Sequence, residues 1–298
     1  METAQAPAGS IVVGVDGSSA ADLALDWAVR QAVLEHRPLT VVHAAHLLGT
    51  NGLAWLDTTG IDDGRLLDNL RVGGHDVLSD ATARAHSSEP ELVVHEVLSA
   101  SDPRTALLEL AAEATAVIVG SRGRGPVSSL LLGSVSVAVS KNAWCPVVVV
   151  RPGDSDIPRQ GILVGVDGTQ HSRPAVEFAY QMAALRSLPL TVVHCFWDAA
   201  HLTSAERDVP DHEAGLEDLR RLLSDAVSET RKKFPDVQDH LQLMRGFSDQ
   251  RLVQASQVMD LMVVGSHRSG SVEKFAFGSI ASTVAEHARC SVAVVPSM

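Results

Sequence analysis

The chain carries the same block of sequence twice. The seven-residue segment IVVGVDG at 11–17 recurs as ILVGVDG at 162–168, and PLTVVH at 38–43 recurs unchanged at 189–194. Both pairs are separated by 151 positions. A repeat with a constant offset predicts that one structural unit is used twice. The 298 residues provide enough length for two domains of ordinary size.

Later matches extend the repeat to the end of the chain. Three of them share an offset of 145: Gly120-Ser121 with Gly265-Ser266, Gly133-Ser134 with Gly278-Ser279, and Cys145 with Cys290. The second copy has therefore lost six residues between its second strand and its Gly-rich loop. The stretch 151–160, RPGDSDIPRQ, has the Pro, Gly and Asp content of a linker. We predict domains over 1–152 and 160–298.

Each copy alternates short, Val-rich apolar runs with amphipathic stretches. In the first copy the predicted strands are 11–15, 39–43, 92–97, 116–120 and 147–150, and the predicted helices are 19–36, 66–85, 104–114 and 134–142. Ser19 and Asp22 have the spacing of a capping box, and 217–233 reads as a long solvated helix of the second copy.

This alternation predicts an α/β protein built from two tandem, doubly wound, open parallel sheets of Rossmann-like type, with about five strands each. Such sheets bind ligands beyond the carboxyl ends of their strands, where the strand order reverses. The Gly-rich turns of this chain fall at those ends, which places a site without naming its ligand.

The segment 120–134, GSRGRGPVSSLLLGS, is the most informative of these turns. Its glycines let the backbone turn tightly and approach a ligand. Gly133-Ser134 then opens a helix, whose free N–H groups and dipole favour phosphate. Arg122 and Arg124 add positive charge. The spacing fits neither a P-loop nor the dinucleotide fingerprint. The residues alone predict a phosphate-binding loop, with a plain Gly-rich turn as the alternative.

An Asp after the first strand, followed by G-x-x-G-x9-G-[ST] after the fourth, resembles the ATP-binding type of the universal stress protein family. Gly120, Gly123, Gly133 and Ser134 fit this spacing. The VGVDG start, the VVH strand and the closing CPVVVV run strengthen the resemblance, which covers both halves. The chain therefore looks like a tandem universal stress protein, and the resemblance implies ATP in each half.

The resemblance also implies which residues bind. In the first half these are Gly14, Val15 and Asp16 at the nucleoside, Ala44 at the adenine edge, Gly120, Arg122 and Gly123 near ribose and phosphates, and Gly133, Ser134, Val135 and Ser136 at the phosphates. The matching positions of the second half are Gly165, Val166, Asp167, Cys195, Gly265, Gly278, Ser279 and Ile280. Arg268 stands where the motif has Gly. It would weaken the second site or, if Gly270 takes over the turn, offer its guanidinium to phosphate.

Several residues of the sequence have more than one possible role. Asp16 and Asp167 could be turn formers before Gly, or could help hold Mg²⁺ through water. His43 and His46 suggest a metal pair, but the second copy has Trp197 in place of the second His, which favours a strand histidine. Cys145 and Cys290 read as small buried apolar residues.

Charge and cysteine content exclude some classes of protein. With 24 Lys+Arg against 36 Asp+Glu, the net charge of −12 argues against a nucleic-acid or anionic-membrane partner. Residues 1–10 have no secretory pattern, and the uncharged stretch 125–140 is too broken to span a membrane. Three cysteines without C-x-x-C indicate neither a disulfide framework nor a zinc ribbon. We expect a cytoplasmic protein.

The expected function is an ATP-binding regulator of the stress-response type, without strong catalysis. A slow ATPase or phosphotransferase using the same pocket is the alternative, and a nucleotide-free scaffold is a third reading. In the family the closing strands pair across a two-fold. We therefore expect 147–150 and 292–295 to pair the two halves as a pseudo-dimer, with further homodimerisation as an option.

Overall fold

A computed structural model describes residues 6–44, 63–123, 132–152, 158–198, 209–210, 213–266 and 279–297. The chain divides into two compact units, Met1–Val150 and Arg151–Met298. Each unit contributes five strands and two layers of helices, and each is described by itself.

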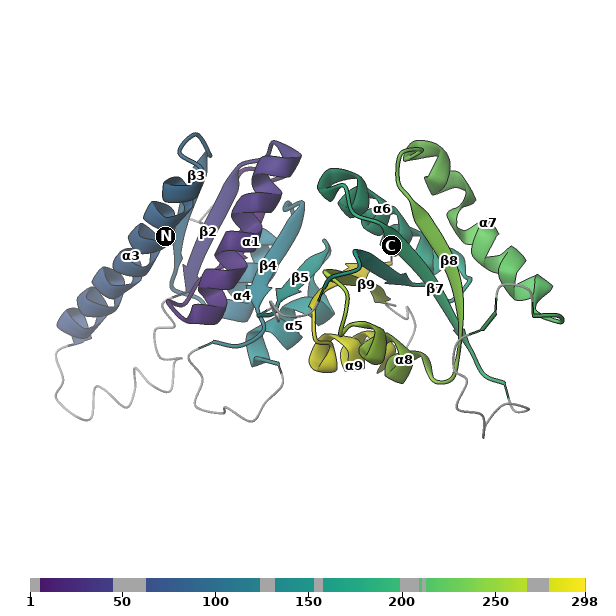
Figure 1. Ribbon diagram of the computed structural model, residues 1–298. Helices are drawn as coiled ribbons and strands as arrows, with labels where there is room; N and C mark the ends of the chain where they lie inside the picture. The colour runs from purple at the N-terminus through teal and green to yellow at the C-terminus, as the bar shows by residue number, and fades with distance from the viewer. Residues whose placement is uncertain are drawn as a thin grey trace. The chain divides into compact units, whose positions relative to one another are not determined.

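The first unit is a parallel sheet with the strand order β3-β2-β1-β4-β5 (Figure 1). Its strands are β1 (Ile11–Gly14), β2 (Leu39–Ala44), β3 (Val94–Ser99), β4 (Ala116–Gly120) and β5 (Val147–Val150). Helices α1 (Ser19–Glu35) and α3 (Asp63–Ser88) pack together on one face, and α4 (Pro103–Leu110) and α5 (Ser134–Asn142) pack together on the other.

The second unit repeats this plan with the order β10-β9-β6-β7-β8. Its strands are β6 (Ile162–Gly165), β7 (Leu190–Phe196), β8 (Asp239–Arg245), β9 (Leu261–Ser266) and β10 (Ser291–Pro296). After the short 3-10 helix η1 (Gln170–Ser172), helices α6 (Arg173–Arg186) and α7 (Glu217–Lys233) pack together, as do α8 (Ser248–Ala255) and α9 (Ser279–His287). The predicted fold class is confirmed.

Strand register locates the six-residue difference between the copies. Leu39 pairs with Val94 in the first sheet, and Leu190 pairs with Asp239 in the second. Leu190 lies 151 positions after Leu39, whereas Asp239 lies only 145 after Val94. The shortening therefore falls in the connection from β7 to β8, which contains α7.

Aliphatic burial and helix caps account for the local structure. Strands β1 and β6 are buried on both faces, as Val-rich strands covered by two helix layers should be. Ser18 is the N-cap of helix α1, and its hydroxyl accepts from the Ala21 amide at 3.3 Å. The predicted capping box starting at Ser19 is therefore wrong by one residue. Asp22 still lies in the first turn, where its negative charge interacts favourably with the positive end of the helix dipole.

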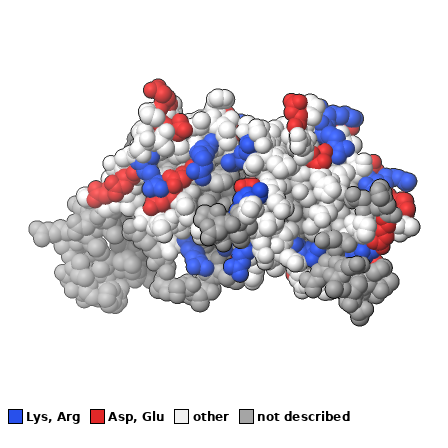
Figure 2. All heavy atoms as spheres, in the orientation of Figure 1, with Lys and Arg blue, Asp and Glu red and all other residues white. Residues whose placement is uncertain are grey.

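None of the helices in the described part of the chain combines the length and apolar character needed to cross a bilayer. On the face seen in Figure 2, described Lys and Arg side chains are interspersed with Asp and Glu. The pairing of 147–150 with 292–295 as a pseudo-dimer stays a prediction, as does the homodimer.

Candidate functional site

The same turn closes the first strand of each unit. The Val15 amide donates to the Val42 carbonyl at 2.9 Å, and the Val166 amide donates to the Val193 carbonyl at 2.9 Å. Each turn places an Asp just after the carboxyl end of the first strand of its unit. The strand order reverses next to this strand, which is where open α/β sheets bind ligands. The two units therefore place Asp16 and Asp167 at equivalent positions.

In the second unit this position opens into a cavity of about 470 Å³, within the usual range for small-molecule sites. Seven residues predicted from the sequence line it: Gly165, Val166, Asp167, Cys195, Gly265, Ser279 and Ile280. Its wall is completed by His171, Ser172, Val193, His194, Ser248, Leu252, Val264 and Ala281. The predicted second-half residues that the structure describes thus converge on one cavity.

Hydrogen bonds fix the Asp167 carboxylate at the rim of this cavity. Its Oδ1 accepts from the Thr169 amide at 2.8 Å, from the Thr169 hydroxyl at 2.9 Å, and from the Ser172 hydroxyl. The Asp167 amide in turn donates to the Ser172 hydroxyl oxygen at 3.0 Å. The side chain is therefore held in one orientation before any ligand arrives.

The strand histidines brace the turns. His194 Nδ1 lies 3.0 Å from the Val166 carbonyl, and His43 Nδ1 lies 2.8 Å from the Val15 carbonyl. A carbonyl oxygen only accepts, so each Nδ1 carries the proton. His46 lies outside the described residues. Among those described, no three His, Cys, Asp or Glu side chains gather closely enough to hold a metal ion.

Cys195 brings a half-buried thiol into the cavity wall. Burial raises its pKa to about 11, against a smaller opposing effect of a hydrogen bond with Ser248. Burial raises the pKa of Cys145 and of Cys290 further, to about 12. All three thiols are therefore protonated near neutral pH, and the predicted burial of Cys145 and Cys290 is confirmed.

Helix N-termini supply the amide donors on both units. Helix α9 begins with Ser279 and Ile280, both exposed at the cavity. Helix α5 begins at Ser134 after an N-cap Gly133 that makes no side-chain cap bond. The first-turn N–H groups of a helix have no intrahelical acceptor, and the dipole there favours an anion.

Ser136 is placed differently from the other predicted residues of this helix end. It is buried, and its hydroxyl donates to the Gly120 carbonyl at 2.7 Å. The side chain therefore ties α5 to the end of β4. Ser134 is exposed and Val135 is half-buried at the same helix start.

Close contacts with neighbouring atoms explain Gly120 and Gly123 of the first unit, whereas Gly133 has only ordinary contacts. A Cβ on Gly123 would lie 2.5 Å from Asp16 Oδ2, and one on Gly120 would lie 2.7 Å from the Ala20 carbonyl oxygen. A Cβ on Gly133 would lie 3.6 Å from the Cα of Arg122. The structure thus gathers Asp16, Arg122, Gly123 and Gly133. Gly14 and the half-buried Ala44 end the neighbouring strands β1 and β2.

Some predictions fall on residues that the structure leaves undescribed. Arg268 and Gly278 are among these, as are Gly270 and Arg124. The effect of Arg268 on the second site stays a prediction.

Sequence reasoning missed the cavity residues that come from other elements. Ser248 and Leu252 lie on α8, far along the chain from the Gly-rich motifs. Ser172 was detectable, because a Ser five residues after the turn Asp can bond back to it, as it does here.

Comparison with known proteins gives a consistent result. The model of the universal stress protein family matches residues 8–151 and again residues 158–296. Two universal stress proteins of Mycobacterium tuberculosis are 32% and 33% identical over 292 and 297 residues. Each match spans 95% of this chain, with 96% and 95% of the relatives covered. A universal stress protein structure from Archaeoglobus fulgidus superposes with a TM-score of 0.72 at 16% identity, covering 98% of this chain and all of that one.

Proposed function

Because the chain belongs to the universal stress protein family and carries the family's domain twice, we propose that it binds an adenine nucleotide, ATP, at the carboxyl ends of the strands in each half. Its role would be regulatory: occupancy changes the surface that a partner reads. We further propose that the chain performs no efficient catalysis of its own.

The cavity of the second unit carries this proposal. It joins a helix N-terminus at Ser279, an oriented carboxylate at Asp167 and an apolar wall at Val193 and Leu252. These three chemistries match the phosphates, the ribose hydroxyls and the base of a nucleotide, in that order. The residues present therefore fit the proposed ligand.

In the first unit the same roles would fall to the α5 N-terminus and to Asp16. The Gly123 backbone lies against the Asp16 carboxylate, so a ligand that moves one of these groups would also move the other. Binding there would link the end of β1 to the segment after β4. Such linkage can shift conformation only by as much as the ligand prefers one arrangement over the other.

Magnesium would enter with the nucleotide. Each site offers one Asp at the turn, and Mg²⁺ is usually held by one or two carboxylates together with substrate phosphates and water. We propose that Asp16 and Asp167 contribute at most one ligand each, directly or through water.

Calorimetry with ATP on nucleotide-free protein tests the proposal. Asp167→Asn should weaken the second site about tenfold, because a charged hydrogen-bond acceptor is lost. Asp236→Asn, an exposed carboxylate on the α7–β8 connection, serves as the matched control and should leave binding unchanged. Absence of ATP binding to the wild-type protein would refute the proposal. Turnover of ATP to ADP that disappears in Asp16→Ala would favour the ATPase alternative.

A further inference from the structure

Two aromatic rings of the second unit, one just after β7 and one just before α8, stand exposed. Trp197 is 55% exposed and Phe247 is 56% exposed, yet their ring centroids lie only 4.8 Å apart, with planes inclined by 37°. Two large apolar side chains in contact on a surface indicate a binding role more strongly than isolated exposed residues do.

The pair lies close in the chain to two residues of the cavity wall. Trp197 follows Cys195 by two residues, and Phe247 directly precedes Ser248; Cys195 and Ser248 both line the cavity and are hydrogen-bonded to each other. The contact between Trp197 and Phe247 also joins the end of β7 to the start of α8, as the bond between Cys195 and Ser248 does. The sequence neighbours of the rings thus place them next to the β7–α8 part of the cavity wall.

The order of the strands sets which part of a ligand would reach this end of the cavity. The cavity runs from the α9 N-terminus across the ends of β9, β6 and β7. Neighbouring strands are about 4.8 Å apart, so its two ends are about 10 Å apart. If phosphates occupy the α9 end, as the proposed function requires, the base lies at the β7 end beside the rings.

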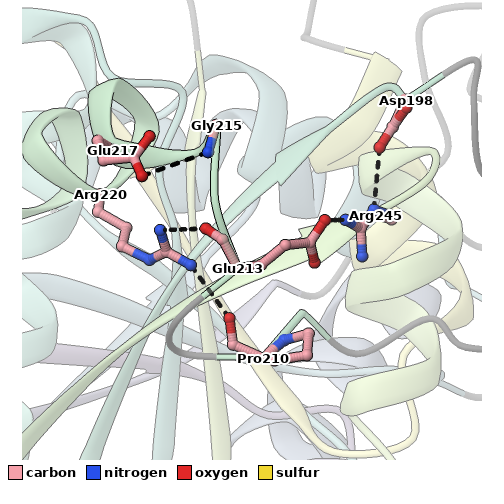
Figure 3. A network of polar contacts seen from close by, with 7 residues as sticks. All are labelled: Asp198, Pro210, Glu213, Gly215, Glu217, Arg220 and Arg245. Atoms are coloured by element: carbon pink, nitrogen blue, oxygen red, sulfur yellow. Dashed lines mark hydrogen bonds and ion pairs between the residues drawn. The ribbon is translucent and has the colours of Figure 1, made fainter.

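A buried arginine fastens the two segments that carry the rings (Figure 3). Arg245, only 8% exposed at the end of β8, pairs with Asp198 at 3.1 Å and with Glu213. Asp198 directly follows Trp197, and Arg245 precedes Phe247 by two residues. The Gly246 amide also donates to the Phe196 carbonyl at 3.0 Å. Both segments are thus tied together directly next to the ring contact.

Glu213 is itself held from α7. Arg220 donates to the Glu213 carbonyl at 2.8 Å and to the Pro210 carbonyl at 3.1 Å, and the Gly215 amide donates to Glu217 at 3.3 Å (Figure 3). The Arg245 guanidinium also lies 5.7 Å from the centre of the Phe196 ring. The arrangement limits the movement of Arg245, and through it of the aromatic pair.

The first half has a different set of residues at these positions. The repeat places His46 opposite Trp197, Ala100 opposite Arg245 and Asp102 opposite Phe247. Asp102 caps α4 by accepting from the Arg104 amide at 2.9 Å. The aromatic pair and its arginine therefore belong to the second half alone.

We propose that Trp197 and Phe247 form a base-stacking surface that gives the second site a preference for purine over pyrimidine nucleotides, with Arg245 as the residue that positions it. Stacking suits purines best because their two fused rings cover the most aromatic surface. This inference rests on the proposed function and assigns the base preference of the second site to named residues.

Titration of the full-length protein with ATP, CTP and tripolyphosphate tests it. Trp197→Ala and Phe247→Ala should each weaken ATP binding at the second site about ten- to hundredfold and reduce its preference for ATP over CTP. Tripolyphosphate binding should not change, because it has no base. Trp197→Phe should keep most of the affinity. Trp144→Ala, which removes a 68% exposed tryptophan of the first half, is the control.

Arg245→Met provides the test of positioning. It should weaken ATP binding and reduce the part of the ATP-induced tryptophan fluorescence change that Trp197→Phe removes, with tripolyphosphate binding retained. Unchanged ATP affinity and ATP/CTP ratio in both alanine variants would overturn the inference. An equal loss for tripolyphosphate would also overturn it. A wild-type protein that binds tripolyphosphate and both nucleotides equally would reject base stacking alone, whereas one that binds none of them would reject the proposed function as well.

Discussion

The two halves of this chain keep the same turn and differ in what surrounds it. Val15 and Val166 make the same bond to the neighbouring strand, and His43 and His194 brace it in the same way. Around that shared frame the glycine near the end of the fourth strand of each half differs: it is tightly enclosed in the first half and has more room in the second. A Cβ on Gly265 would lie 3.8 Å from its nearest neighbour, against 2.7 Å for Gly120.

The side chains diverge at the base end of the sites. The second half has Cys195, Ser248 and Phe247 where the first has Ala44, Pro103 and Asp102. Backbone features that build the sheet are thus common to both copies, while the groups that would meet the ligand's base are not. Duplication has left one fold with two chemically distinct candidate sites.

The glycine difference predicts the largest effect. Gly120→Ala should destabilise the protein by about 1–3 kcal/mol, because the new methyl group meets the Ala20 backbone, which cannot move aside easily. Gly265→Ala should change stability by less than about 0.5 kcal/mol, since only ordinary contacts form. Urea unfolding of the two variants measures both values. Equal destabilisation would contradict the distinction between the halves.

Helix caps predict the next largest effect and separate stability from binding. Asp102→Ala removes the α4 cap and should cost about 1 kcal/mol. Phe247 provides no side-chain cap for α8, so in Phe247→Ser the new cap should offset the loss of the ring contact with Trp197, which leaves stability within about 0.5 kcal/mol while nucleotide binding weakens. Thermal unfolding and calorimetry on the same samples check this. A Phe247→Ser protein that binds ATP normally would contradict the stacking role.

Ser172 predicts a smaller loss confined to the second half. Its hydroxyl bonds to both the amide and the carboxylate of Asp167, and the first half has Ala21 at this position. Ser172→Ala should cost about 0.5–1 kcal/mol and weaken the second site, because Asp167 gains freedom. Unfolding and calorimetry again provide the measurement, and weakening of the first site instead would count against the assignment.

Cys195 predicts an effect on reactivity with little change in stability. With its pKa raised to about 11 by burial, about one thiol in a thousand is ionised at pH 8. Alkylation should therefore be slow at pH 8 and about tenfold faster for each pH unit until pH 11, because only the thiolate reacts. ATP should slow labelling of Cys195 further. Peptide mass spectrometry follows the reaction, and fast labelling at pH 7 would contradict the burial argument.

Much of the fold was predictable because aliphatic periodicity decides it. The bounds of α5 and α7 match the prediction, whereas β3 begins two residues late because the Leu92 amide is used in a turn with Glu89. Helix α3 continues through Gly73-Gly74 despite their low helix propensity. A Cβ on Gly74 would lie 2.6 Å from Leu98, so the glycine allows the helix to pack closely on the sheet.

The candidate site was predictable only where backbone motifs define it. Gly165, Asp167 and Ser279 belong to turns and helix starts with a recognisable local sequence. The contributions of Leu252 and Phe247 depend on how α8 packs beside β7, which no local pattern encodes. These residues reach the site only through the tertiary packing of distant segments, so the sequence alone did not predict them.

The central claim, an adenine nucleotide in each half, is tested most directly by identifying what the purified protein carries. Protein prepared without added nucleotide would be denatured, and the released small molecules identified by absorbance and mass. The account predicts an adenine nucleotide approaching one per half, with half that amount if Arg268 impairs the second site. No nucleotide on the protein, together with no thermal shift on adding ATP, would contradict the account.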